Sequence, residues 1–315
     1  MKILVTGSAG FIGSAVCSTL LQNGHTVLGI DNYSKYGVVS RGHDNHINYH
    51  FTFGDCKNTS LLLELINQAD LVIHTAASIG GIKYWNDYGF TMLIENERIT
   101  TALFEAWYGS LTKPKMIIFS SSQVYENCLD FPNVETQIII GPTSGYGLQK
   151  LLLEKYAIEA HKQARLTYTI VRPFNAYGLD ELTVKNKNHV IVDLINAIKK
   201  QSTIELLGDG NQIRTFTYIN DIADAINMCV SNPESDDKIY NVCSDDTVTI
   251  NELVELIAQI LNKKINVKYV DPLPNDVRYR KGSSALIQRE LGWKPHTNLE
   301  KGLRYIIYNH DQLTT

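Results

Sequence analysis

The chain opens with Lys2-Ile3-Leu4-Val5-Thr6-Gly7-Ser8-Ala9-Gly10-Phe11-Ile12-Gly13. Its short apolar run predicts a buried strand, and three glycines follow that strand at once. In such a turn the first glycine permits the tight bend, the second lets the backbone approach a pyrophosphate, and the third lets the next helix pack closely on the strand. The N-terminus of that helix then faces the negative charge. The stretch therefore predicts a phosphate-binding turn of a dinucleotide site.

Apolar runs and amphipathic stretches alternate through the first half of the chain, which is typical of a parallel sheet with helices on both faces. The expected strands are Ile3–Thr6, Thr26–Ile30, Leu71–His74, Met116–Ser120 and Tyr168–Arg172. The expected helices are Phe11–Asn23, Thr59–Gln68, Met92–Tyr108 and Gly147–Gln163. We predict an α/β fold of the Rossmann type, with a doubly wound parallel sheet.

The alternation loosens after Pro173, although helices are still expected at Val190–Lys200, Asp221–Ser231 and Ile250–Leu261. We expect the chain to leave the nucleotide-binding domain, to re-enter it and to leave it again. The predicted nucleotide-binding domain comprises residues 1–173 and about 215–243. A smaller, discontinuous C-terminal substrate-binding lobe comprises about 174–214 and 244–315.

The composition is that of an ordinary globular protein. Of the 315 residues, 44% are hydrophobic and 20% are charged, and the formal net charge is −4. This balance predicts no nucleic-acid or membrane partner. The N-terminus shows no secretory leader, and no run reaches the roughly 18 apolar residues of a membrane span, so we expect a cytoplasmic protein. Five widely spaced cysteines favour reduced thiols over a disulfide framework or a metal site.

Asp31 ends the second expected strand, where an acidic residue binds the hydroxyls of an adenosine ribose. A carboxylate there repels the 2′-phosphate of NADP, so we predict NAD as the cofactor. Asp31 could instead only cap the next loop, and Arg41 could favour NADP. Asp55 could approach the adenine or could cap a helix, and His74 could lie near the cofactor or could be an ordinary core residue.

Tyr146 and Lys150 stand four residues apart at the start of an expected helix, which puts both side chains on one face. A phenol has a pKa near ~10, so it needs a nearby positive charge to act as a base near neutrality. Lys150 and the nicotinamide of NAD⁺ would supply that charge. The run Ser120-Ser121-Ser122-Gln123 follows an expected strand, at the sheet edge where ligands bind in such folds.

These elements, in this order, resemble extended short-chain dehydrogenases/reductases of the nucleotide-sugar epimerase/dehydratase family. The matching set is the glycine turn, Asp31, Gly54-Asp55, His74–Ala77, Ser120–Tyr125, Tyr146 with Lys150, and Arg172-Pro173-Phe174-Asn175-Ala176-Tyr177-Gly178. The resemblance implies that Tyr146 is the catalytic base, that Lys150 activates it and binds the cofactor ribose, and that Ser121 bonds to the sugar. It also implies homodimers packed through the helices at 92–108 and 147–163.

Motifs and resemblance together give the predicted sites. The cofactor-binding residues are Gly7, Gly10, Phe11, Ile12, Gly13, Asp31, Asn32, Asp55, Cys56, His74, Ala76, Ala77, Tyr146, Lys150 and Pro173. The substrate-binding residues are Asn175, His189, Val190, Arg214 and Arg278. Arg214 resembles the family's arginine for the substrate diphosphate, and Arg278 or its neighbour Arg280 resembles a second basic contact. The implied partner is a nucleotide-diphosphate sugar, with GDP favoured over UDP because of two local resemblances to enzymes like GDP-fucose synthase.

Those two resemblances are Ile79-Gly80-Gly81-Ile82 and Asn188-His189-Val190-Ile191. His189 could act as an acid or base, could bond to the diphosphate, or could cap a helix. Gln123 stands where 4,6-dehydratases of the family have an acid and where the synthase-like enzymes have a cysteine, and its amide can do neither task. Ser122 is a further candidate for catalysis or substrate binding.

The predicted reaction is NAD-dependent 4-epimerisation of a nucleotide sugar through a transient 4-keto intermediate, with Tyr146 as base. The alternatives are a 4-ketoreductase or C4 oxidase, a 3,5-epimerase/reductase and a 4,6-dehydratase of the same family. A non-catalytic NAD-binding regulator is the most distant alternative.

Overall fold

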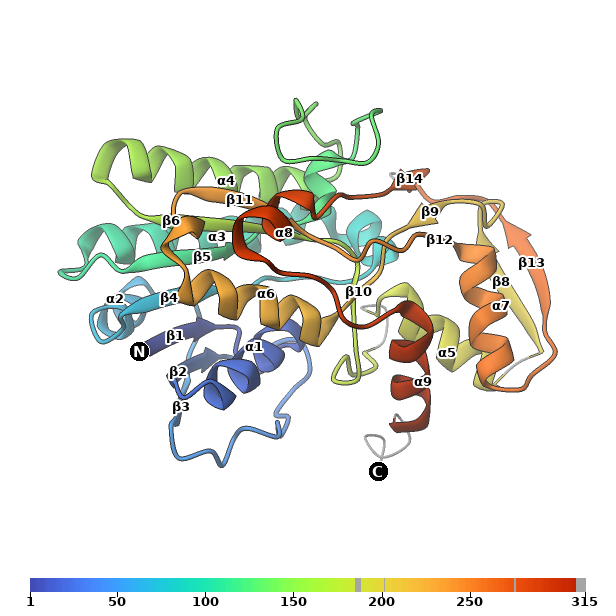
Figure 1. The fold of residues 1–315 in the computed structure, drawn as a ribbon, viewed down its shortest axis with the longest axis horizontal. Helices are drawn as coiled ribbons and strands as arrows, with labels where there is room; N and C mark the ends of the chain where they lie inside the picture. Colours follow the sequence, from blue (N-terminus) through green and yellow to red (C-terminus); the bar gives the residue numbers. More distant parts are fainter. Residues whose placement is uncertain (185–187, 201, 275, 310–315) are drawn as a thin grey trace.

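The computed structural model describes residues 1–309 except 185–187, 201 and 275. Its centre is a seven-stranded sheet of order β11-β6-β5-β4-β1-β2-β3, in which every neighbouring pair is parallel. The strands are β1 (Lys2–Thr6), β2 (Thr26–Asp31), β3 (Tyr49–Phe53), β4 (Leu71–His74), β5 (Lys115–Phe119), β6 (Tyr168–Pro173) and β11 (Lys238–Val242). The predicted Rossmann-type fold is confirmed (Figure 1).

Helices cover both faces of the sheet. They are α1 (Phe11–Gln22), α2 (Thr59–Ile66), α3 (Ile82–Gly109), α4 (Gly145–Ala164), α6 (Ile219–Ser231) and α8 (Ala285–Leu291). One face packs on α1 and α6 through side chains such as Leu20 and Ile226, and the other packs on α2, α3 and α4 through Leu62, Leu103 and Leu153. Two separate apolar cores therefore hold the sheet rigid between them.

The sheet order reverses between β1 and β4, because the chain adds β2 and β3 on one side of β1 and β4, β5 and β6 on the other. At such a switch point the loops after neighbouring strands diverge and leave a crevice at their carboxyl ends. The glycine turn follows β1 and the small residues Thr75–Ala77 follow β4. This topology predicts a cavity at the carboxyl ends of β1 and β4.

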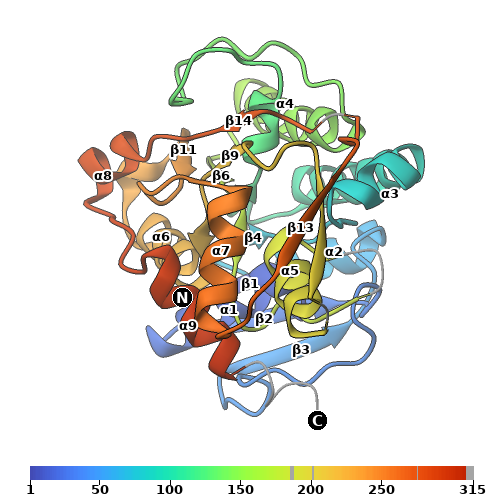
Figure 2. The same ribbon diagram turned by 90° about the vertical axis from the view of Figure 1, so that its right-hand side faces the viewer.

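The remaining elements form a smaller group beside the sheet. They are β7 (Ala176–Tyr177), α5 (Val190–Lys200), β8 (Thr203–Leu207), β9 (Ile213–Arg214), β10 (Thr217–Tyr218), β12 (Val248–Thr249), α7 (Ile250–Ile260), β13 (Asn266–Val270), β14 (Tyr279–Arg280) and α9 (Leu299–Asn309). Figure 2 shows α5, α7 and α9 together, and a core that includes Ile195, Leu253 and Ile306 joins them. The exact domain boundaries stay a prediction.

One helix differs from its expected bounds. Instead of starting at Met92, α3 starts at Ile82 and runs to Gly109, with non-helical backbone at Tyr88 (φ −127°, ψ 24°). Its first ten residues lack the apolar period of a core-facing helix because several of them, including Trp85, line the ligand cavity instead. Helix α5 and strand β4 have the predicted bounds, and the other expected helices and strands differ by one or two residues at one or both ends.

Candidate active site

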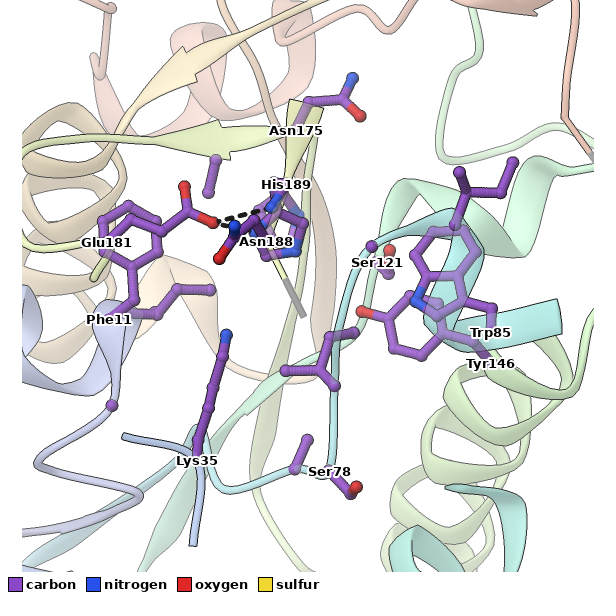
Figure 3. A pocket seen from close by; sticks show the side chains of 18 of the residues that line it. Phe11, Lys35, Ser78, Trp85, Ser121, Tyr146, Asn175, Glu181, Asn188 and His189 are labelled. Atoms are coloured by element: carbon purple, nitrogen blue, oxygen red, sulfur yellow. Dashed lines mark hydrogen bonds and ion pairs between the residues drawn. The ribbon is translucent and has the colours of Figure 1, made fainter. Parts of the chain in front are cut away.

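A cavity of about 970 Å³ lies at the carboxyl ends of the strands, between the sheet and the smaller group of elements. Most predicted site residues line it: Gly7, Gly10, Phe11, Ile12, Gly13, Asp31, Asn32, Asp55, Cys56, Ala76, Ala77, Ser121, Ser122, Tyr146, Lys150, Pro173, Asn175, His189, Val190 and Arg214. Three predicted residues are not among its lining: His74, Gln123 and Arg278. Figure 3 shows Tyr146 and Ser121 on one wall, opposite His189 and Glu181.

The glycine turn has the geometry that a pyrophosphate requires. Gly7 has φ +72°, a left-handed conformation that glycine adopts without strain. A Cβ atom on Gly13 would lie only 2.1 Å from the carbonyl oxygen of Gly7, so no larger residue fits there. The turn therefore presents bare backbone to the cavity at the first turn of α1, as a dinucleotide site needs.

The residues predicted to lie at the adenosine half of the cofactor are also close together. Asp31 accepts hydrogen bonds from the backbone nitrogens of Ala9 (3.1 Å) and Tyr33 (2.7 Å), and it still lines the cavity. Arg41 is 6% exposed, and it donates to the carbonyl oxygens of Ala9 (2.8 and 3.0 Å) and Asp180 (3.1 Å). Because these carbonyls occupy the guanidinium, Arg41 supports the turn and does not favour the 2′-phosphate of NADP.

The catalytic candidates meet at one wall of the cavity. Tyr146, in the first turn of α4, forms a side-chain hydrogen bond with Ser121. Burial raises the pKa of the Tyr146 phenol, while that hydrogen bond and the charge of Arg280 oppose the rise. The Lys150 ammonium lies 5.9 Å from the centre of the Tyr146 ring and donates to the carbonyl oxygen of Phe119 at 2.8 Å.

Lys150 is held in a buried position one helical turn after Tyr146. Burial lowers its pKa to about 8, although the charge of Glu154 opposes the change, so the ammonium form still dominates at neutral pH. A cation at this distance stabilises the phenolate that a base requires. The Tyr146, Lys150 and Ser121 set thus has the arrangement of an acid–base centre.

Trp85 was not predicted, yet it lies directly on the phenol. Its ring stacks on Tyr146 with centroids 4.9 Å apart and planes 23° apart. Figure 3 shows both rings side by side at the cavity wall. The sequence shows Trp85 three residues after the Ile79–Ile82 loop. Its place beside Tyr146 could be recognised only because α3 begins at Ile82.

His74 belongs to the core and not to the cavity wall. Its Nδ1 lies 2.8 Å from the Thr6 hydroxyl, and the side chain is 3% exposed. Burial lowers its pKa to about 3, so the imidazole is neutral at physiological pH. The alternative of an ordinary core histidine describes this position better than a cofactor ligand does.

The two arginines near the C-terminal end of the chain occupy different places. Arg278 is half exposed and pairs with Asp209 at 2.6 Å on the surface, whereas Arg280 lines the cavity. Arg280 lies in β14, where it is paired with Arg214 of β9, whereas Arg278 precedes the strand and pairs with Asp209. Arg214 also lines the cavity and pairs with Asp276 at 2.6 Å.

His189 is paired with a carboxylate that was not predicted. Its Nδ1 bonds to Glu181, which is 2% exposed and also accepts from the His189 backbone nitrogen at 3.3 Å. Burial favours the neutral acid, but His189 and Lys35 hold the pKa of Glu181 below its ordinary value. A Cβ on Gly81 would lie 2.3 Å from the carbonyl oxygen of Asn188, so the Gly-Gly loop and the histidine segment are in contact.

This geometry agrees with the relationship found by comparison. Residues 3–243 match the model of the NAD dependent epimerase/dehydratase family. The chain belongs to this family. The family assignment confirms the predicted resemblance, the predicted enzyme and NAD as its cofactor.

Several family members resemble the chain over nearly its whole length. The putative UDP-glucose 4-epimerase of Methanocaldococcus jannaschii is 29% identical over 97% of this chain and 97% of its own. The GDP-mannose 3,5-epimerase 1 of Oryza sativa subsp. indica is 24% identical over 98% of this chain and 81% of its own. The UDP-glucuronic acid 4-epimerase of Bacillus cereus, solved in complex with UDP-glucuronic acid and NAD, is 26% identical with a TM-score of 0.89, over 99% of this chain and 100% of its own.

Among the residues that the structure describes, no helix of this family member is long and apolar enough to cross a membrane. The five cysteines are free thiols, and all of them are buried. Burial raises the pKa of Cys56, the cysteine that lines the cavity, to about 12, so its thiol is protonated at neutral pH. Cys56 therefore contributes packing to the cavity wall and does not supply a thiolate nucleophile.

Proposed function

We propose that this family member is an NAD-dependent 4-epimerase of a nucleotide-diphosphate sugar, with Tyr146 as the acid–base residue. The observation that carries the proposal is the buried Tyr146 phenol, hydrogen-bonded to Ser121 and facing the cavity next to Lys150. This set can remove a proton from a sugar hydroxyl and return it. It needs no further acid or base.

The residues present fit NAD. The glycine turn would hold the pyrophosphate, because Gly13 leaves no room for a side chain between turn and helix. Asp31 would bind the adenosine ribose, and Lys150 would bind the ribose next to the nicotinamide. When bound, NAD supplies the acceptor and the donor of the hydride.

The proton moves through the chain's own residues. Ser121 would bond to the C4 oxygen of the sugar and orient it, while Tyr146 takes the hydroxyl proton as the 4-keto sugar forms. The 4-keto sugar would then turn so that C4 is reduced on its opposite face. Lys150 would stabilise the phenolate until Tyr146 returns a proton to the C4 oxygen. The cavity, at about 970 Å³, is large enough for a nucleotide sugar beside a dinucleotide to remain enclosed through both halves of the reaction.

Gln123 disfavours two of the alternatives. It is fully buried behind the wall and presents no acid or base at the position that the dehydratases and the synthase-like enzymes use. A specific observation does favour a 3,5-epimerase as second candidate: His189 faces the cavity with Glu181 behind it, and one relative is named as a GDP-mannose 3,5-epimerase. That reaction would require a second group to remove the carbon-bound protons.

We infer a UDP-sugar as the substrate in place of the GDP-sugar first expected. The two relatives named above as 4-epimerases carry UDP-sugars in their names. The GDP preference rested on the Gly-Gly loop and the His189 segment. These two segments contact each other, which accounts for both motifs without any role in binding the nucleotide base.

The test is proton NMR of the enzyme with NAD and UDP-sugars in deuterated water. We expect inversion at C4 without deuterium on carbon, and loss of turnover by a factor on the order of 10³ in Tyr146→Phe, since proton transfer by a side chain typically contributes 10²–10⁴. Deuterium at C3 or C5 would support the 3,5-epimerase instead. A stoichiometric need for NADH would indicate a reductase.

The predicted homodimer also stays a proposal. Helices α3 and α4 contain the segments expected at the interface, 92–108 and 147–163, and their exposed side chains include Tyr108 (58% exposed) and Leu148 (40%), with Phe90 (77%) just before the first segment. Covering this apolar surface with a second copy would be favourable. Sedimentation of wild type and of Phe90→Lys would check it, with a lower mass expected for the variant.

A further inference from the structure

Gln123 is buried completely, and both the nitrogen and the oxygen of its side-chain amide form hydrogen bonds. The nitrogen Nε2 lies 3.4 Å from the hydroxyl of Ser144, which caps α4 by accepting from the Gly147 nitrogen at 3.1 Å. The oxygen Oε1 accepts a hydrogen bond from Nη2 of Arg280 on β14. Gln123 therefore ties the start of the tyrosine helix to an arginine of the smaller group of elements.

Arg280 differs from the other arginine of the cavity. Arg214 is paired with Asp276 at 2.6 Å, whereas no ion pair of Arg280 occurs within the described part of the chain. Two carboxylates act on Arg280 through their charge without forming an ion pair with it: Asp276 pairs with Arg214, and Glu126 accepts from the Ser144 hydroxyl at 2.7 Å. Desolvation and the charge of Arg214 lower the pKa of Arg280 to about 9, so it keeps its charge at neutral pH.

The contacts of Gln123 place this cation near the reacting end of the cavity. A Cβ on Gly147, the residue after Tyr146, would lie 3.0 Å from the Gln123 carbonyl oxygen and 3.1 Å from its Cγ. Gln123 thus packs on the first turn of α4, and the guanidinium that it holds acts electrostatically on the Tyr146 phenol. Arg214 has no such effect on Tyr146 and is the better candidate for the diphosphate.

We propose that Gln123 is a positioning residue that holds Arg280 for a carboxylate on the sugar ring, and that the substrate is a nucleotide-linked uronic acid. The inference rests on the proposed function, because Tyr146 acting at C4 puts the C5 substituent beside it. In a uronic acid that substituent is a carboxylate. A partly desolvated cation without an anionic partner is costly, and a substrate carboxylate would offset that cost with charge-assisted, bidentate hydrogen bonds.

The test is binding, measured by calorimetry on the NAD-loaded enzyme with matched pairs of ligands. The pairs are UDP-glucuronic acid with UDP-glucose and GDP-mannuronic acid with GDP-mannose, and free UDP and GDP report on the diphosphate. We expect at least one uronic acid to bind about 10-fold to 100-fold more tightly than its neutral partner, as hydrogen bonds to a charged group would give.

Two variants remove the preference in different ways. Arg280→Gln deletes the cation, and Gln123→Glu supplies a carboxylate that pairs with it in nearly the same volume. Both should bring the uronic and neutral sugars to within about 3-fold of each other while the affinity for the free nucleotide stays, because only the carboxylate contact is lost. Arg289→Gln, on exposed α8, is the matched control and should keep the preference.

Three outcomes would overturn the inference. They are the absence of any preference for a uronic acid in wild type, a preference that survives Arg280→Gln, and an equal loss of free nucleotide, which would assign Arg280 to the diphosphate. Because binding is the readout, the result is independent of turnover. A uronic acid that binds through Arg280 without inversion at C4 would refute the proposed epimerisation and leave this inference standing.

Discussion

Glu154 and Arg172 form a buried ion pair beneath the catalytic wall. Arg172 Nε lies 2.8 Å from Glu154 Oε1 and Nη2 lies 2.7 Å from Oε2, and both residues are 2% exposed. Glu154 also accepts a hydrogen bond from Ser120, and its charge acts on Lys150, one helical turn away. The pair connects α4 to β6 directly behind the cavity.

Removing one member of this pair should destabilise the protein strongly. Glu154→Gln leaves Arg172 as an uncompensated buried charge, so the free energy of unfolding should fall by about 3–5 kcal/mol. Urea unfolding followed by circular dichroism measures it. Glu159→Gln is the matched control, because Glu159 lies on the same helix with its side chain 65% exposed. A loss equal to that of the control would contradict the role given to the pair.

Gly13→Ala should weaken NAD binding. The new Cβ would meet the Gly7 carbonyl oxygen at 2.1 Å, which forces apart the turn and the helix that hold the pyrophosphate. Overpacking of this kind costs about 1–3 kcal/mol, which corresponds to roughly 10-fold to 100-fold weaker binding. Calorimetric titration with NAD checks it. Gly109→Ala is the control, since its nearest contact is 3.9 Å away, and equal affinities for both variants would argue against the turn as the cofactor site.

His189→Gln should separate substrate binding from chemistry. Glu181 holds Nδ1 of the ring, which leaves the other nitrogen to face the cavity as a hydrogen-bonding group for the diphosphate. We expect KM to rise about 10-fold with little change in kcat, because such a contact is present in ground state and transition state alike. Steady-state kinetics of the variant distinguish the two roles. A fall in kcat at constant KM would indicate instead that His189 is an acid or base of the reaction.

His74 should make the protein lose stability in acid. Its folded-state pKa of about 3 lies below the ordinary value of 6.5, so the unfolded chain binds a proton that the native core excludes. Between these two values, the free energy of unfolding should fall by about 1.4 kcal/mol per pH unit from this group as pH decreases. His74→Gln should remove that part of the slope in urea unfolding at pH 4 to 7. His50→Gln on exposed β3 is the control, and equal slopes for wild type and His74→Gln would refute the assignment.

The local sequence determined the sheet and the cofactor turn. Apolar runs such as Leu71–His74 predict strands because their residues are buried on both faces of the sheet. The spacing of the glycines follows from the close contact between Gly13 and Gly7 within the turn. Tyr146 and Lys150 could be placed on one face of a helix because their spacing fixes that geometry. These inferences depend on neighbours close along the chain, so one sequence is enough for them.

Only the tertiary structure decided which distant side chains share the cavity. Three contacts join separate segments: Trp85 with Tyr146, Glu181 with His189, and Arg280 with Gln123. The spacing of residues within one segment does not predict such contacts. The same is true of the choice between Arg278 and Arg280, which depends on the pairing of Arg280 in β14 with Arg214 in β9. Sequence alone predicted the fold and proposed Tyr146 as the base, because both depend on local patterns. Packing between distant elements determined which side chains surround Tyr146 in the cavity, because those contacts join separate segments of the chain.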